Sequence, residues 1–162
     1  PLVAEDLGLI TDAVVALRDR FQFPGMKIFQ FGFDGDPKNP HLPHNHVPNC
    51  LAYTGTHDND TLLGWFQHLD PSTKQRVLDY LGSTSNEMPW PIIRAMYSSV
   101  AYLAIAPMQD LLGLGSEHRM NQPGVALGNW NWRFNWSQVG EHLAERMRQL
   151  AAIYDRLPKP QH

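Results

Sequence analysis

The chain has 162 residues, of which 43% are hydrophobic and 18% charged, and its formal net charge is −3 at pH 7. The apolar share predicts a folded core and excludes a disordered chain. The charge gives no electrostatic reason to expect nucleic acid or a membrane surface as a partner, and no apolar run approaches the roughly 20 residues of a membrane span. The single cysteine, Cys50, excludes an intramolecular disulfide framework and favours a reducing compartment, so we expect a cytoplasmic protein.

Short apolar runs and helical patterns alternate along the first third of the chain. Residues 2–4 are predicted as a strand that ends at the carboxylates Glu5-Asp6. A helix is predicted over residues 11–21 and a second strand over residues 26–31. Residues 34–49 hold four Pro and three His and are predicted as an irregular loop. A loop of this length inside a compact domain is usually functional.

The same alternation continues towards the C-terminus. Residues 50–54 are predicted as a third strand and residues 103–107 as a fourth. Helices are predicted over residues 61–68, 71–81, 87–100 and 137–154. Asp70 is a suitable N-cap for the second of these helices, and Gly82 is a suitable C-terminal stop. Buried strands separated by helices predict a parallel sheet in an α/β architecture.

Polar side chains gather directly after three of the predicted strands, at Glu5-Asp6, His57-Asp58 and Gln109-Asp110. In a (β/α)8 barrel the carboxyl ends of the strands form the catalytic face. A complete barrel needs about 250 residues and eight strand–helix units, whereas this chain has about half of that. We therefore expect part of a larger barrel, cut or processed from something longer. Its first and last strands would be free edges, so we expect the isolated chain to self-associate or swap elements.

Two of these strand ends could carry chemistry. A carboxylate at Glu5-Asp6 can be a general acid if an apolar pocket raises its pKa, although one of the two could simply cap the next segment. Residues 56–60 (THDND) could hold vicinal sugar hydroxyls beside a carboxylate that supports positive charge, or they could bind a divalent metal. An Asp or Asn of this group could instead cap the helix that begins at Thr61.

Two further clusters admit two interpretations each. His41, His44 and His46 could be metal ligands, but their spacing is not a zinc signature, and solvated loop histidines are the favoured interpretation. Residues 129–133 (NWNWR), with Trp136 nearby, suit a carbohydrate, because a sugar packs on indole while amides and guanidinium bind its hydroxyls. The alternative is that these Trp residues close the bottom of a barrel or anchor the last helix, and we expect at least one of them in the core.

Taken together, the strings of this chain resemble one family, the 4-α-glucanotransferases (amylomaltases or disproportionating enzymes), which are related to the α-amylases. The strings are Ala4–Gly8, Pro24–Lys27 leading into Gln30-Phe31, Leu42–Asn45, Tyr53–Thr61, Gln109–Gly115, Arg119–Asn121 and Gly128–Arg133. They occur in the family's order and extend from residue 3 to about residue 133. The resemblance implies that residues 1–162 are the C-terminal half, strands five to eight with their helices, of one (β/α)8 TIM barrel.

The resemblance also implies roles for individual residues. Glu5 matches the general acid/base and Asp58 the carboxylate that stabilises the transition state. His57 matches a residue that binds sugar hydroxyls, and Asn45 and Asn129 fall in motifs that line the glucan cleft. The nucleophilic Asp of the family follows its fourth strand and has no counterpart here. The implied activity is retaining transfer of α-1,4-glucan segments from maltodextrin to the 4-hydroxyl of an acceptor glucan, without a cofactor or metal.

Three other functions compete with this one. A related α-glucan hydrolase would use the same carboxylates and differ in its ratio of hydrolysis to transfer. A non-catalytic glycan-binding fragment would fit a chain that lacks the nucleophile, and we expect the isolated chain to be inactive. A metal-dependent hydrolase would need His44, His46, His57 and Asp58 as ligands, which the resemblance explains without a metal.

Overall fold

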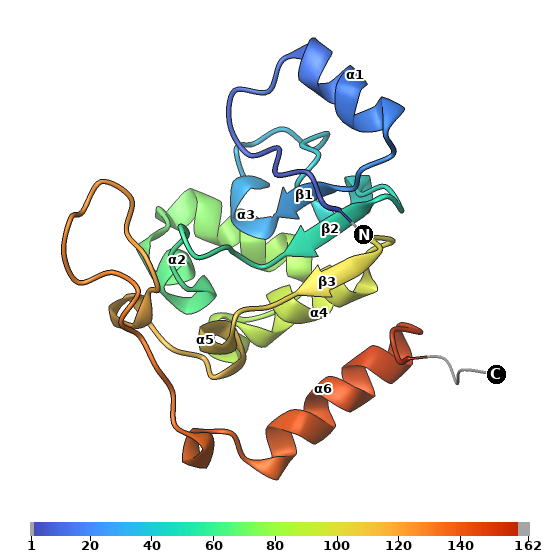
Figure 1. The fold of residues 1–162 in the computed structure, drawn as a ribbon. Helices are drawn as coiled ribbons and strands as arrows, with labels where there is room; N and C mark the ends of the chain where they lie inside the picture. Colours follow the sequence, from blue (N-terminus) through green and yellow to red (C-terminus); the bar gives the residue numbers. More distant parts are fainter. Residues whose placement is uncertain (1, 159–162) are drawn as a thin grey trace.

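The computed structural model describes residues 2–158. The strands are β1 (Gly25–Ile28), β2 (Cys50–Tyr53) and β3 (Leu103–Ile105), and the helices are α1 (Asp12–Arg20), α2 (Leu62–His68), α3 (Pro71–Leu81), α4 (Trp90–Ser98), α5 (Met108–Leu111) and α6 (Glu141–Ile153). The strands pair in parallel in the order β1-β2-β3, as Figure 1 shows. The predicted α/β class with a parallel sheet is therefore confirmed.

The register of the sheet brings the carboxyl ends of its strands to one edge. Gly25 of β1 pairs with Cys50 of β2, and Leu51 of β2 pairs with Leu103 of β3. Because the strands run parallel and start nearly level, the loops that follow them leave the sheet together. The predicted polar clusters at these strand ends are thus neighbours in space, although they are about 50 residues apart in the sequence.

The core lies between the sheet and the helices on one side of it. Figure 1 shows α2, α3 and α4 on this side, and α6 lies against α4. The buried cluster consists of Phe29, Cys50, Ala52, Leu62, Ile92, Ile93, Met96, Ala101 and Leu150. The middle of α4 is buried, whereas Val100, which falls within the helix predicted over residues 87–100, lies beyond the end of the helix and is exposed.

The predicted strand at residues 2–4 is wrong. This segment is not assigned to a strand; the Ala4 amide donates to the carbonyl of Pro24, just before β1, at 3.0 Å. A strand needs a row of paired backbone groups, and this segment lacks one within the described residues. The second predicted strand also ends early, because residues 29–31 turn into a 3-10 helix after Ile28.

Helix boundaries follow the capping residues that the sequence offered. Asp70 caps α3, because its Oδ1 accepts hydrogen bonds from the Ser72 and Thr73 amides at 3.0 Å. Gly82 ends α3 with a left-handed backbone (φ 58°), which glycine adopts without steric cost. Thr61 caps α2 through its hydroxyl, which accepts from the Gly64 amide at 3.1 Å. The predicted bounds of these two helices are confirmed to within one residue.

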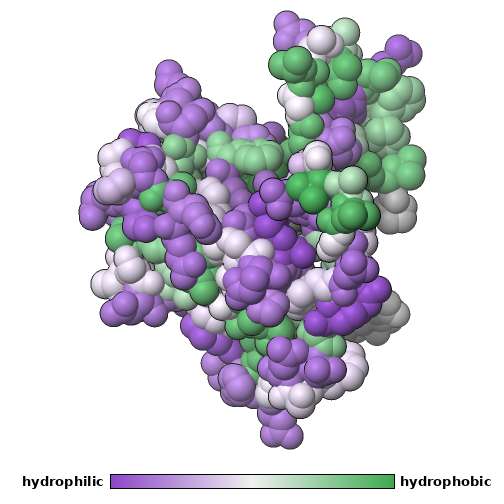
Figure 2. Space-filling view, turned by 90° about the vertical axis from the view of Figure 1, so that its left-hand side faces the viewer, coloured by the Kyte–Doolittle hydropathy of each residue, from purple (hydrophilic) through white to green (hydrophobic). Residues whose placement is uncertain are grey.

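Two apolar surfaces have no cover among residues 2–158. Helix α1 buries none of its residues, although Leu17 and other apolar side chains recur on it at helical spacing. In Figure 2 hydrophobic residues gather at the top of the molecule, where α1 stands apart from the other helices. Along the open edge of the sheet, Leu103 and Ile105 of β3 are also exposed. The free edge predicted at β3 is confirmed.

Helix α6 is held to the core by buried leucines and by guanidinium groups, among them that of Arg156, which lies just after the helix. Arg156 donates to the carbonyl oxygens of Tyr97 (2.6 Å), Ser99 (2.6 Å) and Ala101 (2.9 Å), which lie at and beyond the end of α4. Leu143 and Leu150 of α6 are buried. Within residues 2–158, none of the helices is long and apolar enough to cross a membrane.

Candidate active site

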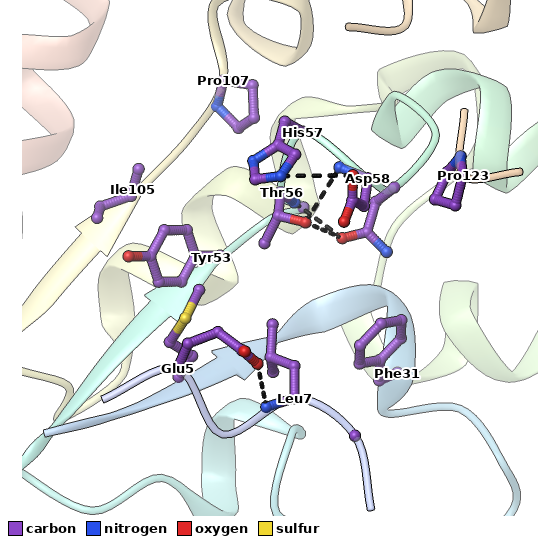
Figure 3. Close-up of a pocket in the computed structure, with 14 residues that line it drawn as sticks. Glu5, Leu7, Phe31, Tyr53, Thr56, His57, Asp58, Ile105, Pro107 and Pro123 are labelled. Atoms are coloured by element: carbon purple, nitrogen blue, oxygen red, sulfur yellow. Dashed lines mark hydrogen bonds and ion pairs between the residues drawn. The ribbon is translucent and has the colours of Figure 1, made fainter. Parts of the chain in front are cut away.

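A cavity of about 920 Å³ lies at the carboxyl ends of the strands (Figure 3). Apolar side chains such as Tyr53 and Ile105, the last residues of β2 and β3, form part of its wall. Glu5 reaches the cavity from the N-terminal segment, whereas His57 and Asp58 reach it from the loop after β2. A mostly apolar hollow with a few polar groups is typical of small-molecule sites.

The side chains of Glu5 and Asp6 make different contacts. The Asp6 side chain is only 7% exposed, and its carboxylate accepts from Arg18 Nη1 (2.6 Å) and from the Met26 amide (2.7 Å). It ties the N-terminal segment to α1 and β1. Glu5, in contrast, faces the cavity, and its Oε1 accepts from the Leu7 amide at 2.5 Å. The alternative that one carboxylate of the pair is structural therefore holds for Asp6.

The Asp6 carboxylate occupies the space that a side chain at position 25 would need, so glycine fits there. A Cβ built on Gly25 would overlap Asp6 Oδ2 and lie 2.9 Å from its Cγ. The carboxylate therefore packs directly against the backbone of β1, where it also accepts the Met26 amide. This contact fixes the position of the Asp6 backbone and therefore of its neighbour Glu5.

His57 and Asp58 present polar atoms to the cavity from the loop of residues 55–61. Their side chains are 55% and 52% exposed, and His57 Nε2 lies 3.4 Å from Asp58 Oδ1. Asp58 Oδ1 also accepts from Asn121 Nδ2 at 2.6 Å, which restrains the rotamer of the carboxylate. A half-exposed carboxylate that is held through one of its oxygens is suited to stabilise positive charge on a ligand.

The segment of residues 116–130 packs against this loop. Arg119 Nη2 donates to the Asp58 carbonyl oxygen at 3.0 Å, and the Asn121 amide donates to the His57 carbonyl oxygen at 3.1 Å. The centroids of the Trp130 and His57 rings lie 4.9 Å apart. Trp130 adopts a left-handed backbone (φ 65°), which is uncommon for a bulky residue and marks a constrained turn. The predicted functional set omitted Asn121, although Arg119–Asn121 is one of the family-like strings.

Hydrogen bonds of the Asp60 side chain also hold the 55–61 loop in place. Asp60 Oδ1 accepts from the Thr61 amide (2.8 Å), and Asp60 Oδ2 accepts from Ser116 Oγ (2.6 Å). A Cβ on Gly64 would overlap the Ser116 hydroxyl, so this glycine permits the contact. The predicted helix cap among residues 56–60 is thus one position off, because Thr61 itself caps α2.

Asp110 does not reach the main cavity, although the sequence placed it on the catalytic face. It is 1% exposed, and its two carboxylate oxygens accept from the Thr54 hydroxyl (2.6 Å) and from the Leu62 amide (2.7 Å). Burial raises its pKa to about 6, because the charged form loses its hydration. A smaller cavity of about 190 Å³ lies between Asp110, His57 and Trp130.

Asn45 and Asn129 lie outside the lining of the main cavity, and each braces its own loop. Asn45 Nδ2 donates to the carbonyl oxygens of Pro37 (2.8 Å) and Asn39 (2.9 Å). Asn129 Nδ2 donates to the carbonyl oxygens of Gln122 (3.3 Å) and Val125 (2.8 Å), and its Oδ1 accepts the Gln122 amide. Their role towards a substrate remains a prediction.

The prediction of solvated histidines in the 34–49 loop is wrong for two of the three. His46 is buried, and its Nε2 lies 3.2 Å from the His41 carbonyl oxygen. His41 Nδ1 accepts from the Ile28 amide at 3.0 Å, and burial lowers its pKa to about 4. Exposed His44 lies 3.0 Å from the Tyr80 hydroxyl. Among residues 2–158, no group of three His, Cys, Asp or Glu side chains could hold a metal ion.

The tryptophans of residues 129–136 are not buried, so the expectation that one belongs to the core is wrong. Trp130 and Trp136 are exposed, and Trp132 is half-buried. Trp132 Nε1 donates to His118 Nδ1 at 3.1 Å, and its ring stacks on Phe134 with 5.9 Å between centroids. The tryptophans of the core region are others: Trp65 and Trp90 pack against the buried cluster.

Comparison with known proteins identifies relatives of this chain. A family model described as 4-alpha-glucanotransferase (glycoside hydrolase family 77) matches residues 1–138. The chain is 52% identical over 158 residues to the 4-alpha-glucanotransferase of Synechocystis sp. (96% of this chain, 31% of the relative). It is 46% identical over 165 residues to that of Thermus thermophilus (97% and 33%), and 48% identical over 160 residues to the chloroplastic/amyloplastic one of Arabidopsis thaliana (96% and 28%). The chain thus spans about a third of the length of these relatives.

Two solved amylomaltase structures are also similar to this chain. An amylomaltase from Streptococcus agalactiae in complex with acarbose superimposes with a TM-score of 0.94 at 36% identity, covering 98% of this chain and 32% of that one. An amylomaltase from Corynebacterium glutamicum has a TM-score of 0.66 at 16% identity, covering 93% of this chain and 28% of that one. The second likeness concerns the fold alone.

Proposed function

The chain belongs to the 4-alpha-glucanotransferase family, and we propose that residues 1–162 are the C-terminal portion, strands five to eight, of one (β/α)8 catalytic barrel. In this proposal β1, β2 and β3 are strands six to eight. The segment of residues 2–4, which forms no strand in the structure, takes the place of the fifth strand and, among the described residues, joins the sheet only through the Ala4 amide. The uncovered faces of α1 and β3 support this assignment, because in a closed barrel further elements would cover both.

We propose that the site performs retaining transfer between α-1,4-glucans. An aspartate from chain outside residues 1–162 attacks the anomeric carbon, and Glu5 donates its proton to the leaving 4-oxygen as the glycosidic bond breaks. The first product is a covalent glucosyl ester. Glu5, now a carboxylate, takes the proton from the 4-hydroxyl of an acceptor glucan, whose oxygen attacks the anomeric carbon and releases the aspartate.

Asp58 has an electrostatic role in this scheme, and His57 has a binding role. Asp58 stabilises the positive charge that develops at the anomeric centre, while Asn121 restrains one of its oxygens. His57 binds hydroxyls of the sugar at the cleavage point. Asn45 and Asn129 contribute to the wider cleft, either directly or by shaping the loops that they brace. The scheme requires no cofactor.

The observation that carries the proposal is that Glu5 and Asp58, from segments 53 positions apart in the sequence, line the same cavity. The acarbose complex of the Streptococcus agalactiae amylomaltase supports a glucan-like ligand for such a cavity. We therefore propose maltodextrin as the substrate, and neither nucleic acid nor a membrane as a partner.

The test is disproportionation of maltotriose by the complete protein, expressed with whatever chain precedes Pro1. Glu5→Gln removes the acid/base and should lower kcat by about 10²–10⁴-fold. Asp58→Asn should lower it by about 10²–10³-fold. Glu117→Gln is the matched control, because the Glu117 side chain is 72% exposed and does not line the cavity. Wild-type kcat in Glu5→Gln would refute the assignment.

The same assay separates transfer from hydrolysis. A transferase converts maltotriose into glucose and longer maltodextrins, with no net gain of reducing ends, whereas a hydrolase raises the number of reducing ends. We expect transfer to dominate in the complete protein. A rise in reducing ends that matches the maltotriose consumed would favour the related α-glucan hydrolase.

Two further proposals concern the isolated chain and its compartment. We propose that the isolated chain self-associates through the exposed edge at Leu103 and Ile105; a monomer in sedimentation with cooperative unfolding would contradict this. A cytoplasmic location is supported by the one buried thiol, Cys50. Because the Arabidopsis relative is named chloroplastic/amyloplastic, cell fractionation is the appropriate test.

A further inference from the structure

Asp110 is a buried carboxylate that the proposed mechanism does not use. It lies in α5, directly after β3, and is 1% exposed. Its Oδ2 accepts from the Thr54 hydroxyl at 2.6 Å, and its Oδ1 accepts from the Leu62 amide at 2.7 Å. Thr54 follows the last residue of β2, and Leu62 is the first residue of α2. One side chain therefore holds both ends of the 55–61 loop, which carries His57 and Asp58.

Among the described residues, neither the Thr54 hydroxyl nor the Leu62 amide donates to an acceptor other than Asp110. The backbone near the two ends has one further hydrogen bond each, from the Thr54 amide to the Ile105 carbonyl oxygen (3.2 Å) and from Gln30 Nε2 to the Asp60 carbonyl oxygen (2.8 Å). The Leu62 amide belongs to the first turn of α2, where helix amides have no partner within the helix. The Thr54 side chain is also buried, so its hydroxyl would lose its donor bond without the Asp110 oxygen. Buried donors without acceptors are costly, and the loop ends would move to find water.

Two further hydrogen bonds hold the middle of the loop, and both depend on the position of the loop's ends. Asp60 reaches Ser116 at 2.6 Å, and Asn121 reaches Asp58 at 2.6 Å. Both contacts depend on the position of the loop backbone between Thr54 and Leu62. A displacement at Thr54 or Leu62 would therefore change the direction in which the Asp58 carboxylate enters the cavity.

We propose that Asp110 is a positioning residue for the transfer reaction, whose two carboxylate oxygens hold the ends of the 55–61 loop and so direct His57 and Asp58 into the cavity. This inference rests on the proposed function, because it assigns Asp110 an effect on groups that the function places against the substrate. Asp110 itself is not a catalytic residue.

The hydrogen-bond chemistry predicts which substitutions preserve the arrangement. The Leu62 amide can only donate, so it needs an acceptor at one oxygen position. The Thr54 hydroxyl can donate or accept. Asn at position 110 can therefore keep both bonds, with its oxygen facing Leu62 and its amide facing Thr54, whereas Ala keeps neither. The geometry requires a planar group with an acceptor on the Leu62 side, not a negative charge.

The experiment measures kcat and KM for maltotriose disproportionation in the complete protein, well below each variant's melting temperature. Asp110→Ala should lower kcat on the order of 10- to 100-fold, because small misplacements of a group that acts in the transition state have effects of this size. Asp110→Asn should stay within about fivefold of wild type. Thr54→Val, a milder change at the other partner, should lower kcat by about 3- to 10-fold, and Thr54→Ser should restore it.

Hydrogen exchange of a peptide covering residues 55–62 provides a readout that does not depend on activity. Asp110→Ala and Thr54→Val should speed its exchange, and Asp110→Asn and Thr54→Ser should not, while peptides of α4 exchange as in wild type. Slow exchange in Asp110→Ala, or unchanged kcat in that variant, would overturn the proposal. Equal losses of kcat in Asp110→Asn and Asp110→Ala would also overturn it, because charge and not geometry would then matter. If wild type transfers no glucan, the proposed function fails, and hydrogen exchange still decides whether Asp110 holds the loop.

Discussion

Replacement of Asp110 by Asn should make the protein more stable at neutral pH. Burial raises the pKa of Asp110 to about 6, from an ordinary 3.8. The folded state therefore binds the proton more readily than the unfolded state does, so the stability of wild type falls as the pH rises from about 4 to about 6. At pH 7 the cost of keeping this carboxylate charged is about 3 kcal/mol.

Asn avoids that cost, because it is neutral and can keep the bonds to Thr54 and Leu62. Its second amide hydrogen lacks a partner in the structure, which offsets part of the gain. We therefore expect the free energy of unfolding at pH 7 to rise by about 1–3 kcal/mol in Asp110→Asn. The difference from wild type should shrink as the pH falls towards 4 and be lost or reversed below about pH 3, where the wild-type carboxyl is neutral in both states and only the cost of the unpartnered amide hydrogen remains.

Urea unfolding of wild type and Asp110→Asn between pH 4 and pH 8 measures this difference. Asp36→Asn is a suitable control, because Asp36 lies on an exposed loop far from Asp110 in the sequence. Two results would refute the reasoning: a variant less stable than wild type at pH 7, or a difference in stability that does not change with pH.

The remaining predictions concern contacts that hold the site and the last helix. Asp6→Ala should lower the stability by about 2–4 kcal/mol in thermal unfolding, because Arg18 and the Met26 amide lose their acceptor; stability equal to wild type would show that the pair is replaced by water at no cost. Asn121→Asp should lower transfer activity more than Asn121→Ala, because a second carboxylate would lie next to Asp58; the reverse order in kcat would contradict the contact. Arg156→Ala should lower the stability by about 2–4 kcal/mol, because three carbonyl oxygens lose a charged donor, and Arg156→Lys should recover only part of this; equal melting temperatures of the two variants would contradict the role of the guanidinium.

The sequence predicted those features that depend on neighbouring residues. Asp70 and Gly82 bound α3 where capping chemistry places them, and the apolar runs at β2 and β3 form parallel strands. The segment of residues 2–4 failed as a strand for a different reason. Its apolar character is real, but a strand also needs a row of backbone hydrogen bonds to a neighbour, and among the described residues this segment makes only the one from the Ala4 amide to Pro24.

The candidate site divides in the same way. The structure brings Glu5, His57 and Asp58 to one cavity, as the rule that polar groups after barrel strands share one face predicted, although no strand forms before Glu5. The same rule failed for Asp110, because a carboxylate after a strand can turn inward and bind backbone as easily as it can face a ligand. The brace from Asn121 to Asp58 joins residues 63 positions apart, so no local pattern could reveal it.

The histidines of the 34–49 loop illustrate a third limit. Their number and the neighbouring prolines suggested either metal ligands or a solvated loop. In the structure both rings bind backbone groups: His41 accepts from the Ile28 amide of β1, and His46 lies next to the His41 carbonyl oxygen within the loop. A ring that binds buried backbone atoms has no distinct spacing in the sequence, because its partners are set by how the loop packs in the folded chain.

The most direct test of the account is a complementation assay with maltotriose. The chain is assayed alone, then mixed with the N-terminal portion that the proposed function assigns to the complete protein, with free glucose and longer maltodextrins followed by chromatography. The account predicts no transfer by the chain alone, transfer by the mixture, and loss of that transfer when the chain carries Glu5→Gln. Transfer by the chain alone would contradict the central claim, because the attacking carboxylate would then lie within residues 1–162.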